Sequence, residues 1–570
     1  MNKNFADDAL RGLLGRRVPA WARCALVLLA TAVFAVFAYH ARYAKIDEFT
    51  GFRAEELIRF TTVVLAALYA LTAAVALHIG RRLNFGAQAL FCVVIGVILL
   101  AKVSLFDYVS DDYDIFLSGW IYSYSQMGIK EGLGTYIGSD YTPPYLYLLL
   151  LISRVRNYPW QYLVKIVSMA FEALMAYAVT KLAGLKVRGD AGRVVLFCLT
   201  LMLPTVVFNG AYWGQCDVIY TSLCLLALYH ALQKRSAWSM VLFGMALSFK
   251  LQTVFFLPTL LPLWLRKDIK LRHLVLIPAA YMAMMIPAFW GGKSLHHVLT
   301  VYLAQAGGYN GISINGPSLY NLLPSTMDNG MLYDLFGNMA MALGLAMMVV
   351  VCLMLCLNRT RITREGTLLA CLLVLGGVPF FLPKMHERYT FGADVLALVI
   401  AAYRPKRMAL PLLFFPFSVL GALSGLLMPE ITRANTKGDN AATRRLVFTM
   451  LKVTGAFSLA AGAGFVLFGA PLAGFVYRDA GVGEYVRILG FVAPFMYLES
   501  MVDGVLKGLG EQLATFRYSL LDSILRITAI WFVVPKYGMM GFLGVMVVSN
   551  LMTFCLNMKR MMEQIKKPSP

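Results

Sequence analysis

Long apolar runs separated by short polar links fill most of this sequence. Many runs approach or exceed the roughly 18 to 20 residues that a helix needs to cross a bilayer. Shorter apolar runs at 142–153, 237–248, 251–265 and 390–403 are ambiguous. The clearest runs cover 21–40, 59–80, 86–106, 160–183, 192–208, 216–232, 271–290, 331–357, 366–383, 408–428, 446–472, 484–505, 514–535 and 539–558. The pattern predicts an all-α, polytopic membrane helix bundle with about 14 to 17 transmembrane helices.

Composition agrees with this prediction. Of the 570 residues, 59% are hydrophobic and only 14% are charged, and a soluble chain of this length could not bury so much apolar surface. Lys and Arg number 51 against 30 Asp and Glu, for a net charge of +21. In a membrane protein, this excess indicates basic cytoplasmic loops. We therefore expect membrane lipids as partners and no nucleic acid.

The positions of the basic links predict which segments share a face of the membrane. Placing these links in the cytoplasm leaves 107–140, 209–215, 292–330 and 384–389 on the outer face. This topology requires a partial helix at 142–155 and a hairpin of two short helices at 237–265. The basic links are Arg81–Arg82, Lys186–Arg193, Lys234–Arg235, Arg266–Arg272, Arg359–Arg364 and Arg404–Lys406.

Several carboxylates follow the apolar run that ends near residue 106. They are Asp107, Asp111, Asp112 and Asp114, within the stretch "DYVSDDYDIF". A carboxylate at a membrane surface can accept a proton from a substrate hydroxyl if it stays ionised and within hydrogen-bond reach. We take Asp112 as the candidate general base and Asp114 as a substrate-binding residue. A solvated acidic loop is the alternative interpretation.

Two further outer segments combine aromatic and polar residues. "GSDYTPPYLYLLLL" carries Tyr141, and its two prolines suit the first turn of a helix. "NGAYWGQCDVIYTS" places Trp213, Gln215 and Asp217 close together. Aromatic rings, amides and acids of this kind gather where sugars stack and form hydrogen bonds, so we expect these four residues to contact substrate. An interfacial aromatic belt is the alternative for Tyr141 and Trp213.

Cationic residues suited to a phosphate occur in two other links. Lys250 and Gln252 interrupt apolar runs in "GMALSFKLQTVFFLP", where the alternative for Lys250 is a side chain that snorkels to the interface. "LPKMHERYTFGADVL" contains Lys384, His386 and Arg388, which can bind a phosphate as a point charge, a hydrogen-bond donor and a planar fork. The remaining candidate substrate-binding residues are Gln252, Glu387, and Asn315 and Tyr320 of "ISINGPSLYNLLP".

Together these motifs predict glycosyl transfer from a sugar carried on a lipid phosphate. A phosphate leaving group needs charge stabilisation more than protonation, and direct attack on the anomeric carbon needs one carboxylate as base, in contrast to the pair used by glycoside hydrolases. No Cys spacing points to a metal cluster. The sequence requires no cofactor and leaves a divalent metal bound by the acidic link open.

Residues 86–405 resemble the bacterial GT-C glycosyltransferases related to GPI mannosyltransferases. The shared stretches are "DYDIFLSGW", "SDYTPPYLYLL", "AYWGQCDVIYTSLCLLALY", "GMALSFKLQTVFFLP", "ISINGPSLYNLLP" and "LPKMHERYTFGADVL". The resemblance implies a hexosyltransferase domain over 1–405, with Asp112 as the base. It further implies a polyprenyl-phosphate-linked sugar, such as a mannose, as donor and an envelope glycan or lipid as acceptor. The expected location is the bacterial cytoplasmic membrane, with the active site facing outward.

Residues 408–570 resemble one lobe of the oligosaccharide flippases of the polysaccharide-biosynthesis and stage V sporulation type B group. The stretches that carry this resemblance include "YLESMVDGVLKGLGEQLATFRYSLLDSILRI" and "KYGMMGFLGVMVVSNLMTFCLNMKRM". We expect a partial flippase-like domain over 406–570. The alternative function is accordingly a flippase or export component for lipid-linked oligosaccharide. One apolar run, 408–428, separates two basic clusters that both favour the cytoplasm, so the topology at this junction conflicts with the charge rule.

Overall fold

The computed structural model divides the chain into two units, each of which is described by itself. One unit takes in the described residues within Met1–Tyr309, Leu345–Val378 and Thr390–Tyr403. The other takes in those within Asn310–Gly344, Pro379–Tyr389 and Arg404–Pro570. The structure describes residues 18–46, 54–156, 158–187, 189–307, 313–314, 318, 320, 331–358, 362–403, 431, 435, 440–477 and 482–566.

Helices make up nearly all of the regular structure in the first unit. Up to residue 232 they are α2 (Ala20–Ile46), α3 (Ala54–Ile79), α4 (Phe85–Val103), η1 (Tyr113–Leu117), α5 (Ser118–Ser125), α6 (Ile129–Gly134), α7 (Pro143–Ile152), α8 (Trp160–Ala183), α9 (Asp190–Met202), α10 (Pro204–Val206), η2 (Val207–Tyr212) and α11 (Asp217–Leu232). They continue as α12 (Ser236–Phe249), η3 (Leu251–Thr259), α13 (Leu260–Leu265), η4 (Leu271–Val275), α14 (Leu276–Met284), α15 (Ile286–Trp290), α16 (Leu295–Gly307) and α19 (Phe391–Tyr403).

Two long helices, α17 (Met331–Leu357) and α18 (Arg364–Phe381), have residues in both units. The second unit also contains the short strands β1 (Ser313–Ile314) and β2 (Met385–His386), which pair in parallel, and the 3₁₀ turn η7 (Glu387–Thr390). Its long helices are α21 (Asn440–Tyr477), α22 (Val482–Gly508) and α23 (Gln512–Lys566). The predicted all-α class is thus confirmed. The expected domain boundary at 405/406 remains a prediction.

Eight helices of the described part are long and apolar enough to cross a membrane, or up to nine if the bent pair Asp190–Met202 and Pro204–Tyr212 forms one span. Five further apolar helices have 10 to 17 residues. Three of them correspond to the short predicted runs 142–153, 237–248 and 251–265, and two lie within the longer predicted runs 216–232 and 271–290. Apolar side chains cover the outer surfaces of the long helices: Leu28 and Phe37 of α2 are 70% and 61% exposed. Surfaces of this kind suit contact with lipid tails rather than water. The chain is an integral membrane protein.

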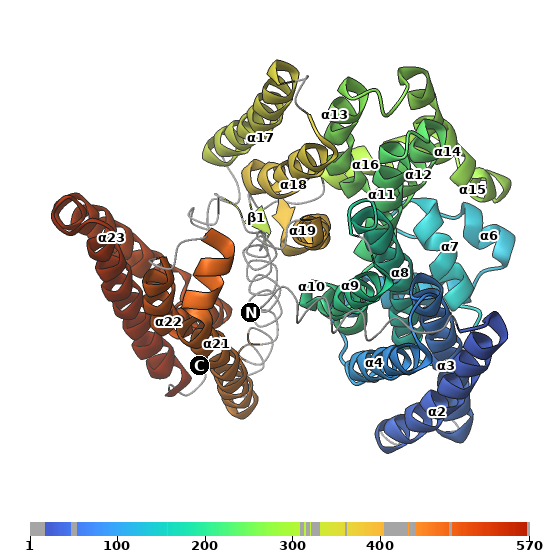
Figure 1. Ribbon diagram of the computed structural model, residues 1–570, viewed down its shortest axis with the longest axis horizontal. Coiled ribbons are helices and arrows are strands. Elements are labelled where there is room, and N and C mark those ends of the chain that lie inside the picture. Colours follow the sequence, from blue (N-terminus) through green and yellow to red (C-terminus); the bar gives the residue numbers. More distant parts are fainter. Residues whose placement is uncertain are drawn as a thin grey trace. The chain divides into compact units, whose positions relative to one another are not determined.

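The first unit is built outward from α8 and α11. α8 packs against α3, α9, α11 and α19, and α11 packs in turn against α12, which contacts α14. Figure 1 shows α8 and α11 in the interior of this unit. Large aromatic residues fill the space between the helices, among them Tyr162, Phe197, Tyr220 and Phe243, all less than 2% exposed. This interior anchors the helix ends that carry the candidate site.

The short helices required by the predicted topology are present. Pro143 and Pro144 occupy the first turn of α7, where proline's missing N–H costs no hydrogen bond. The predicted pair of short helices is α12 followed by η3 and α13, and the helical path is interrupted at Lys250, whose backbone is extended (φ −155°, ψ 136°). Lys250 therefore stands at a break between helices, as the sequence predicts.

The last two predicted spans, 514–535 and 539–558, correspond to the two halves of α23. They are separated at Gly538, whose φ of 55° and ψ of −137° interrupt the helix. Glycine adopts a positive φ without the steric cost that a Cβ atom would impose. The second unit packs α21 against α22 and α22 against α23. The run 408–428, with its topological conflict, lies outside the described residues.

Candidate functional site

The side chains of Asp112 and Gln215 meet beside two π-helical turns, at the start of η1 and just after the end of η2. Asp112 directly precedes η1, and Gln215 lies three residues beyond η2. The side-chain amide of Gln215 donates a hydrogen bond of 2.6 Å from Nε2 to Oδ2 of Asp112. π-helical turns are rare and often occur at functional sites, because the wider turn redirects the chain. The two residues are 103 positions apart in the sequence, so this contact depends on the tertiary fold.

A compact loop holds Gln215 in place. Its backbone N–H donates to the carbonyl of Asn209 at 2.8 Å, which folds the loop back onto η2. Gly214 has a φ of +73°, a conformation that favours glycine. The carbonyl of Trp213 accepts a 2.8 Å hydrogen bond from the hydroxyl of Ser110, two residues before Asp112. The segments that carry Asp112 and Gln215 are therefore joined by the Ser110 hydroxyl as well as by the Gln215 side chain.

Next to Gln215, Asp217 and Lys250 form a buried ion pair. Nζ of Lys250 lies 2.7 Å from Oδ1 of Asp217, and the two side chains are 3% and 0% exposed. Oδ2 of Asp217 accepts a 3.0 Å hydrogen bond from the Asn209 side chain. The alternative that Lys250 snorkels to the interface is therefore wrong, because its ammonium points into the bundle. Its predicted role with the donor phosphate remains a prediction, and Asp217 already neutralises its charge.

Tyr141 lies over the same lysine. Its ring centroid is 5.8 Å from Nζ of Lys250, which is within the range of a cation–π contact. The adjacent Thr142 donates a 2.6 Å hydrogen bond to the carbonyl of Ser248 near the end of α12, which fixes the start of α7 beside Lys250. Tyr141 also makes ring contacts with Trp120 and Tyr145, at centroid distances of 5.8 and 4.8 Å. The predicted substrate residue is thus part of an aromatic cluster beside the ion pair.

A row of buried polar residues on α8 supports both segments and was not predicted as part of the site. Gln161, Lys165, Ser168 and Glu172 are spaced by four, three and four residues, which places them on one face of a helix. All four are buried, between 1% and 7% exposed. We call them the α8 polar stripe. Their helical spacing is visible in the sequence, but they lie within the apolar run 160–183, which was expected to be a transmembrane helix without site residues.

The far end of the α8 polar stripe is a second buried ion pair. Glu172 accepts a hydrogen bond from Lys102 of α4, and both side chains are 1% exposed. Its other oxygen, Oε1, has no hydrogen-bond partner. An added Cβ atom at Gly210 would lie 2.1 Å from that oxygen. A side chain at Gly210 would therefore displace the Glu172 carboxylate from its position against η2.

Other predicted residues of the first unit have different surroundings. Asp114 is exposed on η1, and its carbonyl accepts a hydrogen bond from Ser118. Gln252 is 5% exposed, and its Oε1 is buried without a hydrogen-bond partner. Trp213 is 9% exposed. The structure brings together Asp112, Gln215, Asp217, Lys250 and Tyr141 through the contacts above.

The second predicted cationic motif belongs to the second unit. His386 ends β2, where it is the register partner of Ile314, and its ring lies 5.2 Å from that of Tyr389. Lys384 has a φ of 61°, and Arg388 of η7 is half-buried. The hydroxyl of Tyr320 donates a 2.6 Å hydrogen bond to the carbonyl of Phe381. Asn315 and the side chain of Glu387 lie outside the described residues. The expected convergence of this motif on Asp112 stays a prediction.

The candidate site contains acid, amide and phenol groups. Across the part of the chain that the structure describes, no group of three or more His, Cys, Asp or Glu side chains is arranged to hold a metal ion. Burial raises the pKa of Tyr113, beside Asp112, to about 12. That phenol stays neutral near pH 7 and is unsuited to act as a base, whereas the Asp112 carboxylate, oriented by the Gln215 amide, can accept a proton.

Comparison with known proteins adds little to this description. No protein-family model matches the chain, and no curated protein matches it. Among solved structures, the chain is similar to an inward-facing multidrug resistance transporter of the MATE family, in the MOP superfamily, at 13% identity and a TM-score of 0.26. The match covers 87% of this chain and 99% of the transporter chain. A TM-score of this size carries no argument about fold or function.

Proposed function

We propose that this protein is a membrane glycosyltransferase that moves a hexose from a polyprenyl-phosphate sugar to an envelope glycan or lipid. The observation that carries the proposal is the 2.6 Å hydrogen bond from Gln215 to Asp112, beside the buried Lys250–Asp217 pair. An amide that donates to one carboxylate oxygen favours the ionised form and restricts its rotation. Such a carboxylate is prepared to act as a general base.

The reaction needs only one base. Asp112 accepts the proton of the acceptor hydroxyl as its oxygen attacks the anomeric carbon. The bond from that carbon to the phosphate oxygen breaks, and the polyprenyl phosphate leaves with the electron pair. A single displacement of this kind inverts the anomeric centre. Lys384, His386 and Arg388 are the proposed partners of the phosphate, whose developing negative charge they would stabilise. On the proposed topology, this chemistry takes place on the outer face of a bacterial cytoplasmic membrane.

The direct test uses the purified full-length protein in lipid nanodiscs. We expect that incubation with a panel of polyprenyl-phosphate hexoses and a cell-envelope lipid extract yields a glycan or lipid one hexose heavier by mass spectrometry. A nucleotide sugar supplied without a lipid phosphate is expected to give no product. If no lipid-phosphate donor is consumed in the presence of the full extract, the proposal is wrong.

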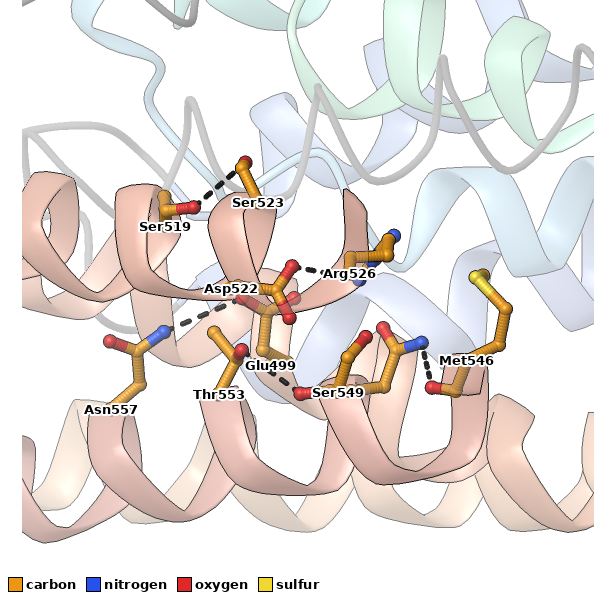
Figure 2. A network of polar contacts seen from close by, with 10 residues as sticks. Glu499, Ser519, Asp522, Ser523, Arg526, Met546, Ser549, Thr553 and Asn557 are labelled. Carbon is orange, nitrogen blue, oxygen red and sulfur yellow. Dashed lines mark hydrogen bonds and ion pairs between the residues drawn. The ribbon is translucent and has the colours of Figure 1, made fainter. Parts of the chain in front are cut away.

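A second candidate function, export of a lipid-linked saccharide, is favoured by polar residues within the apolar helices of the second unit. Figure 2 shows Glu499 of α22 among polar side chains from both halves of α23. Asn557 donates to Glu499 at 3.4 Å, and Arg526 lies 2.8 Å from Asp522. Oδ1 of Asp522, Nε of Arg526 and Oδ1 of Asn557 are buried without hydrogen-bond partners. Polar groups are costly inside a membrane and often mark a substrate path.

Export would depend on this polar network. If the second function is real, Glu499→Gln combined with Asn557→Leu should slow flipping of a fluorescent lipid-linked saccharide in proteoliposomes by about tenfold or more, because each change removes polar groups from the proposed path. Sugar transfer should be unchanged. Ser523→Ala, on an exposed face of α23, is the matched control and should flip normally. Equal flipping rates for all three proteins would rule out this path.

A further inference from the structure

The α8 polar stripe contacts both segments that meet at the candidate base. Each of its members makes a contact with the Asp112 segment, the Gln215 loop or the helix α4 that leads to Asp112. We propose that α8 is the positioning element of the site and that Lys165 and Ser168 set the distance between Asp112 and Gln215. The inference rests on the proposed function, since it concerns how the proposed base is oriented.

Lys165 holds the segment that leads to Asp112. Its ammonium donates to the carbonyls of Leu105, Phe106 and Tyr108, at 3.1, 3.0 and 2.7 Å. These carbonyls lie just past the end of α4 (Val103), where a cation is favoured by the helix dipole. Three charge-assisted hydrogen bonds to one ammonium fix the path of this turn. The chain reaches Asp112 four residues later.

Neighbouring α8 residues strengthen the same attachment. Tyr162 donates a hydrogen bond to Asp107, within the turn that Lys165 holds. Gln161 donates a longer bond of 3.5 Å to the carbonyl of Phe106. Residues 105–108 are therefore tied to the first turns of α8 through side chains on adjacent positions of a single rigid helix.

Ser168 holds the other partner. Its hydroxyl donates a 2.7 Å hydrogen bond to the backbone carbonyl of Gln215, while the side chain of the same glutamine donates to Asp112. One turn further along α8, Glu172 lies against Gly210 of η2. The loop that presents Gln215 is thus attached to α8 at the glutamine itself and at the π-helical turn before it.

These contacts give α8 a role that a purely structural helix would not have. Because Lys165 and Ser168 lie on the same helix face, the separation of their partners is set by the geometry of α8. Displacement of a catalytic group by about 1 Å can lower a rate by about 100-fold. Loss of either attachment should therefore slow chemistry more than it weakens substrate binding.

The test compares two hydroxyl deletions on the same helix. For Ser168→Ala we expect kcat to fall about tenfold with a donor KM within about threefold of wild type, and Ser168→Thr to restore most of the activity. The matched control is Thr180→Val, since the buried Thr180 hydroxyl donates to the carbonyl of Tyr177 on the same helix. It should leave both kcat and donor KM unchanged.

A second variant tests the attachment that Lys165 makes to residues 105–108. Lys165→Met keeps the length of the side chain but removes its three hydrogen bonds, and it should lower kcat at least as much as Ser168→Ala. If this variant does not fold, Ser168→Ala alone decides. If transfer by the wild type depends on Asp112 but the Ser168→Ala protein has a normal kcat, the inference is overturned and the proposed function stands. A wild type that transfers no sugar would overturn the proposed function and, with it, the inference.

Discussion

Asp112→Asn is expected to lower kcat/KM for sugar transfer by about 100- to 10,000-fold, the range that a positioned general base contributes. Asparagine has nearly the size of aspartate, and its amide oxygen can still accept the hydrogen bond from Gln215. It cannot take a proton from the acceptor hydroxyl. Donor KM should change by no more than about threefold, because the substitution removes an interaction that matters mainly in the transition state.

The neighbouring Asp111 provides the control for this experiment. Asp111→Asn removes the same charge one residue away and is expected to keep activity within about threefold of wild type. Product formation can be followed by mass spectrometry across a series of donor concentrations. Full activity in Asp112→Asn, or an equal loss in both variants, would contradict the assignment of Asp112 as the base.

Lys250→Met is expected to lower the free energy of unfolding by about 3 to 5 kcal/mol, the typical cost of leaving one member of a buried ion pair without its partner. Asp217 is fully buried and would keep only its hydrogen bond from Asn209. Denaturant titration in detergent micelles measures this change. Lys186→Met is the control: Lys186 pairs with Glu365 at 3.5 Å, is about half exposed, and should affect unfolding little because surface pairs contribute little.

The double variant Lys250→Met with Asp217→Leu separates the two roles considered for Lys250. If the lysine serves the ion pair, removing both charges should restore stability to within about 1 to 3 kcal/mol of wild type, the remainder being the Asn209 amide without its acceptor. If Lys250 instead binds the donor phosphate, Lys250→Met should raise donor KM at unchanged unfolding free energy. That second result would show the buried pair to be dispensable.

The local features of this fold were predictable from sequence because they depend on neighbouring residues. Pro143 and Pro144 start a helix through their fixed backbone geometry, and a charged Lys250 between two apolar runs marks a break in the span. The short run 237–248 corresponds to α12, whereas the clear run 271–290 is divided among η4, α14 and α15. Hydropathy measures apolar length and does not show where a helix bends or stops inside the protein.

The sequence predicted which residue types occur in the candidate site, but not which of these residues contact one another. Acid, amide and lysine residues of the outer links were identified, yet the pairing of Lys250 with Asp217 follows from the packing of α11 against α12. The π-helical turns η1 and η2 have no simple sequence signature. The α8 polar stripe is periodic, but four polar residues in a long apolar helix are equally compatible with contacts to other spans.

The attachment of two loops to one face of α8 determines where residues can be inserted into this chain. Each residue added to a helix rotates everything beyond it by about 100°. A single insertion between Lys165 and Ser168 would therefore turn one attachment point away from its loop, although the apolar character of the span would be almost unaltered. Extra residues at the tips of the polar links would leave this helical phase intact. We therefore expect insertions to be tolerated least inside α8, although the apolar composition of this helix does not indicate such a constraint.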